Sequence, residues 1–267
     1  RKSNKIKTIQ TSLSIEGNTL SIEQVSDLIE GIPVLGQEKD ILEAKNAITT
    51  YETLPTLNHR PQVDFKKAHK LMMNGLTKGA GRFRDSNVGV FAGSNVAHVA
   101  PQHKMVPKLM GDLFTFLKKN DETSLIIKSC IFHYELEFIH PFSDGNGRMG
   151  RLWQHRILSD YHEVFQFVAI DTLIKNKQTD YYAALGRCDS QGESTEFIEF
   201  SLGLIENALS IYYNNIQHQP KTPLDRLNIA SGQFNATFTR KKYLNLFKNI
   251  STATASRDLK LGIEKNL

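Results

Sequence analysis

The chain has 267 residues, 40% of them hydrophobic and 23% charged, which is ordinary for a soluble globular protein of one large or two smaller domains. No apolar run approaches the roughly 18 residues that cross a membrane, and no internal repeat or low-complexity tract is present, which argues against a membrane-spanning or repeat protein. Cys130 and Cys188 have neither disulfide-framework nor zinc spacing, and no hydrophobic signal region follows the basic residues 1–5. We therefore expect a cytoplasmic protein with no membrane partner, although the chain does not begin with Met and targeting stays open.

The net charge of +5 is unevenly distributed along the chain. From residue 221 onward nine Lys or Arg stand against three Asp or Glu, a net of +6, whereas the remainder has 24 basic and 25 acidic residues, a net of −1. A basic tail on a near-neutral body indicates either an anionic partner such as nucleic acid or a solvated surface without a partner.

Four helices are predicted before residue 80, because apolar residues recur at helical spacing and glycine or proline follows each last turn. Their ranges are 8–15, 22–30, 38–54 and 63–75. Ser21 and Gln24 have the spacing of a capping box at the start of the second helix.

Residues 88–99 contain two short β-prone runs around a Gly-Ser-Asn turn, which predicts a β-hairpin in an otherwise helical protein. A two-stranded ribbon is marginally stable alone. Two interpretations are open: a flap with a free edge beside a site, or a structural connector.

Further helices are predicted at 104–119, 123–139, 152–160, 172–185 and 195–215. The run 123–139 is apolar nearly all round, so we expect it to pass through the core. The polar segment 218–223 contains two prolines and predicts a boundary between a domain of residues 1–217 and one of residues 218–267.

The last part of the chain predicts a helix-turn-helix or winged-helix-like module. Its pattern is two short helices, 239–246 and 252–264, around the turn 247–251. DNA binding and a helical subdomain used for dimer packing both fit this pattern. Because a wing hairpin would have to follow Leu267, we expect the module to be truncated.

The most informative stretch is residues 140–151, His-Pro-Phe-Ser-Asp-Gly-Asn-Gly-Arg-Met-Gly-Arg, which follows the apolar helix. Glycines and a following helix N-terminus can direct backbone N–H groups at an anion, and arginines supply donor forks suited to phosphate. Aspartate is a ligand that Mg²⁺ takes beside nucleotide phosphates, and histidine can accept a proton near neutral pH. Together these residues predict a polyphosphate site with a base at its rim.

This stretch matches His-Pro-Phe-x-Asp-Gly-Asn-Gly-Arg-x-x-Arg, the motif of the Fic family, at every fixed position. The resemblance extends from about residue 11 to about residue 215 and includes residues 81–84 and the hairpin. It implies a mainly α fold: a Fic-type helical core with one β-hairpin flap, followed here by the small C-terminal module. Fic proteins typically transfer AMP from ATP to a hydroxyl side chain of a target protein, with Mg²⁺ as cofactor.

By resemblance, His140 is the general base that takes the proton from the incoming Ser, Thr or Tyr hydroxyl, and Asp144 holds Mg²⁺ between the α- and β-phosphates. The implied nucleotide ligands are Gly145, Asn146 and Gly147 in the anion hole, with the Asn146 side chain contributing, Arg148 at the β-phosphate and Arg151 at the γ-phosphate. Phe142 is implied to anchor the loop in the core.

A second motif, Ser/Thr-x-x-x-Glu-Gly/Asn, resembles residues 12–17 and marks an N-terminal inhibitory helix at about residues 8–18. The resemblance implies that Glu16, with Ser12, pairs with Arg151 and occupies the space of the γ-phosphate. In some relatives this glutamate also orients a water that removes AMP from modified targets.

Tyr181 and Tyr182 match a tyrosine pair that lies near the adenine in relatives, although core packing is an equal alternative for one of them. A nearby position that is often Asn is Asp189 here, which puts the adenine contacts in question.

The leading hypothesis is an autoinhibited protein adenylyltransferase that binds its target along the flap at about residues 88–99 by strand addition. The alternatives are a DNA-binding regulator that uses the Fic site as a nucleotide sensor, and a Fic enzyme that transfers another phosphate-containing group. The sequence identifies neither the target nor what relieves the inhibition, and a homodimer is an expectation from the family.

Overall fold

The computed structural model describes residues 2–92, 95–217, 222–234 and 237–265. The chain divides into two compact units, Arg1–Tyr212 and Tyr213–Leu267, which are described separately. The helices of the described residues are α1 (Lys2–Ile15), α2 (Ile22–Ile29), α3 (Glu38–Thr53), α4 (Gln62–Met72), α5 (Val106–Lys118), α6 (Leu125–Ile139), α7 (Asn146–Tyr161), α8 (Ile170–Asn176), α9 (Gln178–Gln191), α10 (Thr195–Gln217), α11 (Pro223–Gln233), α12 (Arg240–Leu246) and α13 (Thr252–Glu264). Short 3₁₀ turns lie at Leu54–Thr56, His103–Met105 and Glu163–Phe167.

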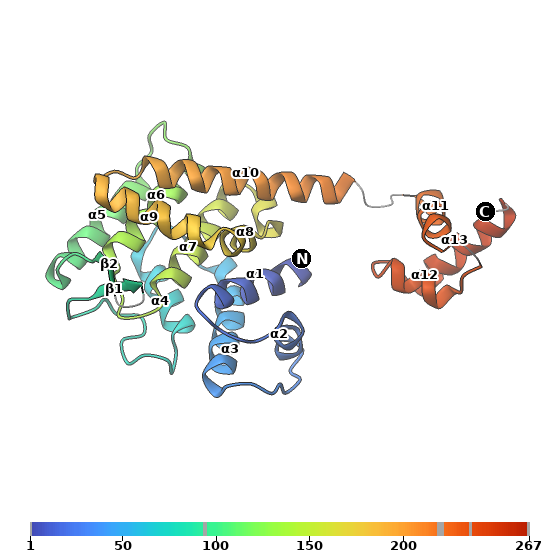
Figure 1. The fold of residues 1–267 in the computed structure, drawn as a ribbon, viewed down its shortest axis with the longest axis horizontal. Helices are drawn as coiled ribbons and strands as arrows, with labels where there is room; N and C mark the ends of the chain where they lie inside the picture. Colours follow the sequence, from blue (N-terminus) through green and yellow to red (C-terminus); the bar gives the residue numbers. More distant parts are fainter. Residues whose placement is uncertain (1, 93–94, 218–221, 235–236, 266–267) are drawn as a thin grey trace. The chain divides into compact units, whose positions relative to one another are not determined.

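Helix α6 is the centre of the first unit, as its nearly continuous apolar sequence predicts. Phe132 and Leu136 on one side belong to a core shared with α1, α3, α4, α5 and α7. Cys130 and Tyr134 on another side belong to a second core that α8, α9 and α10 complete. Helix α7 packs extensively against α6 (Figure 1). The segment that joins these two helices is therefore anchored at both ends in the packed core.

Helix α1 is held against the body of the first unit by contacts with α2, α3, α7 and α8 (Figure 1). Lys175 donates from Nζ to the Ser14 carbonyl at 2.8 Å, and Gln178 donates from Nε2 to the Ile15 carbonyl at 3.2 Å. Both bonds satisfy carbonyls of the last turn that have no partner inside a helix. These bonds hold the C-terminal end of α1, which Glu16 follows directly, against α8 and α9.

The predicted hairpin is confirmed. Strands β1 (Gly89–Ala92) and β2 (Asn95–Val99) pair antiparallel, with an irregularity in register between Val90 and Phe91. The turn residues 93–94 lie outside the described residues. Strand β2 packs against α9.

Two predicted helices need correction, and one helix was missed. Helix α7 begins inside the motif at Asn146 and not at residue 152, because Gly145 adopts a left-handed conformation (φ 85°) and serves as its N-cap. The predicted helix 172–185 is two helices, α8 and α9, which meet at Lys177 without a glycine or proline to signal the break. Helix α11 was not predicted, although Thr222 forms a capping box at its start with Asp225.

The second unit contains α11, α12 and α13 around a small core of Leu227, Ala230, Tyr243 and Ala255. The buried Asp258 binds the Arg226 guanidinium at 2.6 Å and accepts from the Tyr243 hydroxyl at 3.1 Å. Helices α12 and α13 fall where the sequence predicted them. Residues 222–234 and 237–265 contain no strand, so a wing is not seen there; of the predicted break at 218–223, residues 218–221 lie outside the described part.

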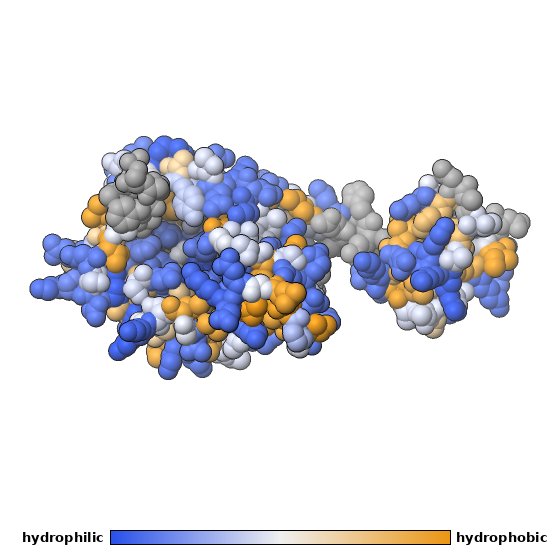
Figure 2. Space-filling view, turned by 60° about the horizontal axis from the view of Figure 1, so that its bottom comes forward, coloured by the Kyte–Doolittle hydropathy of each residue, from blue (hydrophilic) through white to orange (hydrophobic). Residues whose placement is uncertain are grey.

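Among the described residues no helix combines the length and hydrophobicity needed to span a membrane. On the face shown in Figure 2, hydrophilic side chains cover most of the first unit and apolar side chains form smaller patches between them.

Candidate active site

The loop between α6 and α7 is held by a network of buried backbone contacts. His140 closes α6 in a left-handed conformation (φ 49°) and is the only described non-glycine residue with a positive φ. The Arg84 side chain donates from Nε to the His140 carbonyl at 2.8 Å and from Nη2 to the Ile139 carbonyl at 3.3 Å. The Arg84 backbone N–H also donates to the Pro141 carbonyl at 2.9 Å. Arg84 therefore fixes the backbone that carries His140.

His69, on α4, orients the other half of the loop. Its ring stacks on Phe142 with centroids 3.5 Å apart, and Nε2–H donates to the Asp144 carbonyl at 3.0 Å. Nδ1 accepts from the Gly81 N–H at 2.8 Å, so the ring is a neutral Nε2–H tautomer. Burial lowers the pKa of His69 to about 4, which agrees with this assignment.

The Asn146 side chain is bonded to the backbone of the loop. Its Oδ1 accepts from the Phe142 N–H at 2.9 Å and its Nδ2 donates to the Phe142 carbonyl at 3.0 Å. Both polar atoms of this buried amide therefore brace the loop. The Asn146 backbone N–H remains free to face an anion, because the first N–H groups of α7 have no partner inside the helix.

We expect Asn146→Ala to lower the free energy of unfolding by about 1–3 kcal/mol, because the buried Phe142 N–H and carbonyl both lose their partner. Chemical denaturation of the two proteins measures the difference. Asn146→Asp is the matched variant: it keeps the acceptor for the Phe142 N–H but places an oxygen against the Phe142 carbonyl, so it should not restore wild-type stability. Equal stability of the wild type and the alanine variant would contradict the bracing role.

His140 carries a ring that is neutral at pH 7. Burial lowers its pKa to about 4, so the uncharged ring can accept a proton. Its Nδ1 is buried, so an incoming hydroxyl would have to reach the other ring nitrogen, Nε2. In that arrangement Nδ1 carries the hydrogen of the neutral ring.

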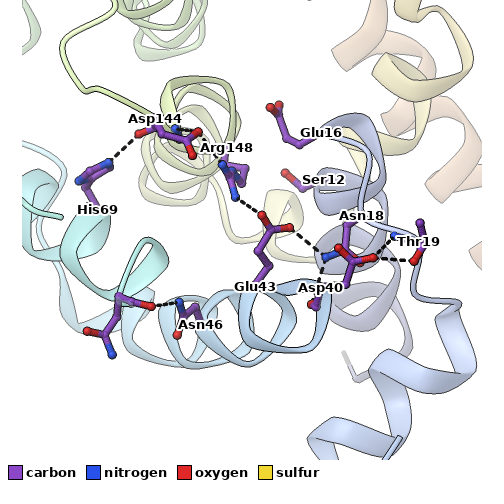
Figure 3. A network of polar contacts seen from close by, with 12 residues as sticks. Ser12, Glu16, Asn18, Thr19, Asp40, Glu43, Asn46, His69, Asp144 and Arg148 are labelled. Atoms are coloured by element: carbon purple, nitrogen blue, oxygen red, sulfur yellow. Dashed lines mark hydrogen bonds and ion pairs between the residues drawn. The ribbon is translucent and has the colours of Figure 1, made fainter. Parts of the chain in front are cut away.

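Arg148 lies between two carboxylates (Figure 3). Nη2 contacts Asp144 Oδ1 at 2.9 Å and Nη1 contacts Glu43 Oε1 at 3.2 Å, and the arginine side chain is 5% exposed. Glu43 lies on α3, and its second oxygen accepts from Asn18 Nδ2 at 3.0 Å. The arginine implied at the β-phosphate is thus linked to the segment that follows α1.

Arg151 is fully buried against the end of α1. Its Nη2 contacts Glu16 Oε1 at 2.7 Å, while Nε donates to Ser12 Oγ at 3.0 Å and Nη2 donates to the Ser12 carbonyl at 3.1 Å. Burial raises the pKa of the Glu16 carboxyl, but the Arg151 guanidinium outweighs this and holds the pKa below its usual value. The pair that the inhibitory motif predicts is therefore present, and it is ionised at neutral pH.

The Glu16 carboxylate lies directly over the start of α7. A Cβ added at Gly147 would be 2.6 Å from Glu16 Oε1, so only glycine permits this approach. Helix N-termini attract anions through their free N–H groups and their dipole. A carboxylate therefore occupies the place where the sequence predicts an anionic phosphate.

Asp144 is accessible enough to bind a cation. Its side chain is 54% exposed, and Oδ1 contacts Arg148 and accepts from the Gly145 N–H at 2.6 Å. The described residues contain no cluster of three or more His, Cys, Asp or Glu side chains for a metal ion. A single exposed carboxylate fits Mg²⁺, which usually takes one or two protein carboxylates and completes its shell with phosphates and water.

The two candidate adenine-binding tyrosines are placed differently. Tyr181 is buried, and its hydroxyl lies 3.0 Å from His133 Nε2, so it packs in the core. Tyr182 is 51% exposed and can offer its ring to a ligand. Asp189 contacts His98 and accepts from the Tyr134 hydroxyl at 3.1 Å.

Glu137 is a buried carboxyl that sequence reasoning did not identify. It lies one turn before His140; its Oε1 has no hydrogen-bond partner among the described residues, and a Cβ added at Gly150 would be 2.5 Å from it. Burial raises its pKa from 4.5 to about 8, so it is mainly protonated at pH 7.

Glu137→Gln should change how stability depends on pH. Between about pH 4.5 and pH 8 the folded protein keeps a proton on Glu137 that the unfolded chain releases, so the Glu137 contribution to the free energy of unfolding falls as pH rises. Glutamine removes this loss, so the free energy of unfolding of the variant should rise relative to that of the wild type from pH 5 to pH 8. Denaturation curves at pH 5 and pH 8 measure it, and the same difference between the two proteins at both pH values would contradict the prediction. Asp171, whose pKa burial raises to about 6, is present in both proteins and cancels.

Comparisons with known proteins agree with this geometry. The family model of the Fic/DOC family matches residues 61–158. The crystal structure of a Fic family protein from Desulfovibrio desulfuricans G20 aligns with a TM-score of 0.78 and 39% identity, over 98% of this chain and 80% of that one. Fic-1 (residues 134–508) from Caenorhabditis elegans aligns with a TM-score of 0.64 at 23% identity, which shows a shared fold.

Two curated relatives carry names that state an activity. The protein adenylyltransferase fic-1 of Caenorhabditis briggsae is 30% identical over 189 residues, which are 65% of this chain and 34% of the relative. The protein adenylyltransferase Fic of Nematostella vectensis is 27% identical over 219 residues, 76% of this chain and 48% of the relative. The chain thus spans between about a third and a half of these relatives. With its motif, helical fold and extended match to the Desulfovibrio protein, this chain belongs to the Fic family.

Proposed function

We propose that this protein is an autoinhibited adenylyltransferase that transfers AMP from ATP to a Ser, Thr or Tyr hydroxyl of a target protein. The observation that carries the proposal is the position of the Glu16 carboxylate, which contacts Arg151 at 2.7 Å and lies against Gly147 at the start of α7. Gly147 belongs to the same loop and helix start as the neutral His140. The names of the curated relatives support the same activity.

The chain's own groups suffice to describe the transfer. The hydroxyl oxygen forms a bond to the α-phosphorus, the bond from that phosphorus to the β-phosphate bridge breaks, and pyrophosphate leaves with the electron pair. His140 accepts the hydroxyl proton. Arg148, Arg151 and the N–H groups at the start of α7 stabilise the charge that builds on the phosphates. Asp144 would hold Mg²⁺, which would neutralise part of the phosphate charge.

Inhibition follows from the competition for Arg151. In the arrangement with Glu16, both Nη2 and Nε of this arginine are already bonded to α1. A γ-phosphate would have to displace the carboxylate or accept its repulsion at close range. We propose that ATP binds in a productive position only when the end of α1 moves away.

The target would bind along the hairpin. Strands β1 and β2 form a two-stranded sheet, so each strand has an edge that the other does not pair. An extended target segment can add to such an edge through backbone hydrogen bonds and present a side-chain hydroxyl to His140.

ATP labelled on the α-phosphate or on the γ-phosphate tests the reaction class. With Glu16→Gly protein and Mg²⁺, the α-label should enter protein and the γ-label should leave with pyrophosphate. Incorporation of the γ-label alone would show phosphate transfer and overturn the proposal, as would the absence of both labels from the protein and from an added lysate.

A further inference from the structure

His98, on the flap strand β2, connects three separate elements. Its Nδ1 lies 2.7 Å from Oδ2 of Asp189 on α9. Its Nε2 lies 2.8 Å from the carbonyl oxygen of Phe138 on α6, and its ring packs against the Phe138 ring at 5.2 Å. The side chains of His98 and Asp189 are 12% and 20% exposed, so the contact is largely shielded from solvent.

Both ring nitrogens of His98 are bonded within the protein. A carbonyl oxygen can only accept, so Nε2 of His98 donates to Phe138. Nδ1 contacts Oδ2 of Asp189, and the other oxygen of Asp189 accepts from the Tyr134 hydroxyl at 3.1 Å. His98 and Asp189 therefore join strand β2 to α6 and α9 through three contacts.

The location of this pair links it to the site. Phe138 lies two residues before His140, and Asp189 lies on the same helix as Tyr182. Strand β2 contacts α9, and His98 is the described side chain of this strand that reaches both helices. The titratable groups that face His98 are Asp189 from α9 and His140 from the end of α6.

We propose that His98 and Asp189 are positioning residues that hold the flap strand against α6 and α9, and that Asp189 therefore serves the flap and not the nucleotide. Each oxygen of Asp189 already has a partner within the protein, Oδ1 the Tyr134 hydroxyl and Oδ2 the His98 ring. The link with target docking rests on the proposed adenylyl transfer, but the contact between His98 and Asp189 itself does not.

The contact of the His98 ring is measured first. In protein labelled with ¹⁵N-histidine, the Nε2–H signal of His98 should be protected from exchange with water, because it is bonded to the Phe138 carbonyl. In Asp189→Asn this signal should exchange faster, because the ring loses its carboxylate partner. Equally fast exchange of the ring N–H in both proteins would overturn the proposal, whatever the protein's enzymatic activity.

A double-mutant comparison then tests the effect on the flap. Amide hydrogen exchange at residues 95–99 should accelerate about tenfold in His98→Gln and in Asp189→Asn, and the double variant should be no faster than either. Additive effects would show that the two residues act separately and would contradict the proposal that they hold the strand together. Lys108→Gln removes an exposed cation paired with Asp112 and serves as the control, with unchanged exchange.

The role of Asp189 is tested by nucleotide affinity. In a Glu16→Gly background, a fluorescent ATP analogue should bind the Asp189→Asn protein within about twofold of its parent. A loss of about tenfold or more would make Asp189 a nucleotide ligand and overturn the assignment. If neither protein binds the analogue, the adenylyltransferase proposal fails, while exchange of the His98 ring N–H still decides whether His98 and Asp189 hold the flap strand.

Discussion

Replacing Glu16 by glycine should raise AMP transfer by roughly 5- to 150-fold, the range that a coupling of about 1–3 kcal/mol produces. Glu16 contacts Arg151 at 2.7 Å and lies over Gly147, where the phosphates would bind. Removing the carboxylate frees the guanidinium for the γ-phosphate and removes a like charge from its neighbourhood. The initial rate of label transfer from α-labelled ATP measures the effect.

Glu16→Gln is the matched control for this prediction. Glutamine keeps the volume and can still contact Arg151, but it carries no charge, so its rate should lie between those of the wild type and the glycine variant. Equal rates for all three proteins would show that α1 does not inhibit transfer.

Loss of His140 should have the opposite effect. In the Glu16→Gly background, His140→Ala should lower transfer about 10²- to 10⁴-fold, the usual contribution of a general base. ATP affinity should change little, because the groups that we propose for phosphate binding lie on α7, after His140 in the chain. Rapid-quench transfer rates and equilibrium binding of an ATP analogue separate the two effects.

The backbone at His140 makes a second variant necessary. Alanine is strained at φ 49°, whereas asparagine tolerates a left-handed conformation. His140→Asn should therefore keep the loop in place and still lose transfer. Transfer by His140→Asn at the rate of its parent would rule out His140 as the base.

The helical core was predictable because its signals are local. Helix α6 follows from a long apolar run, and α2 from the Ser21 and Gln24 capping box, which the structure contains. The start of α7 was missed because its glycines resemble a loop. Gly147 and Gly150 lie in the first turns of this helix, which begins at Asn146 because Gly145 supplies the left-handed N-cap.

The contact between Glu16 and Arg151 was predicted from two motifs that lie far apart in the sequence. Glu43, His69 and Arg84 were not, although each binds the loop directly or through Arg148. These contacts span 105, 75 and 56 positions, and no spacing rule connects residues over such distances. They depend on how α3, α4 and the segment before β1 pack around α6 and α7.

The side chain of Asn146 shows a different limit of sequence reasoning. The motif gives the position of Asn146, but it does not reveal that the amide group bonds both the N–H and the carbonyl of Phe142. Asp189 is similar, because its partner His98 lies 91 positions earlier on a strand whose register could not be predicted.

Mass spectrometry of the Glu16→Gly protein after incubation with ATP and Mg²⁺, alone and with a cell lysate, tests the central claim most directly. We predict an adduct with the mass of one adenylate group on a Ser, Thr or Tyr side chain, at a lower level with the wild type and absent with Glu16→Gly/His140→Asn. An adduct with the mass of a phosphate group, or no adduct on any protein, would contradict an adenylyltransferase held back by Glu16.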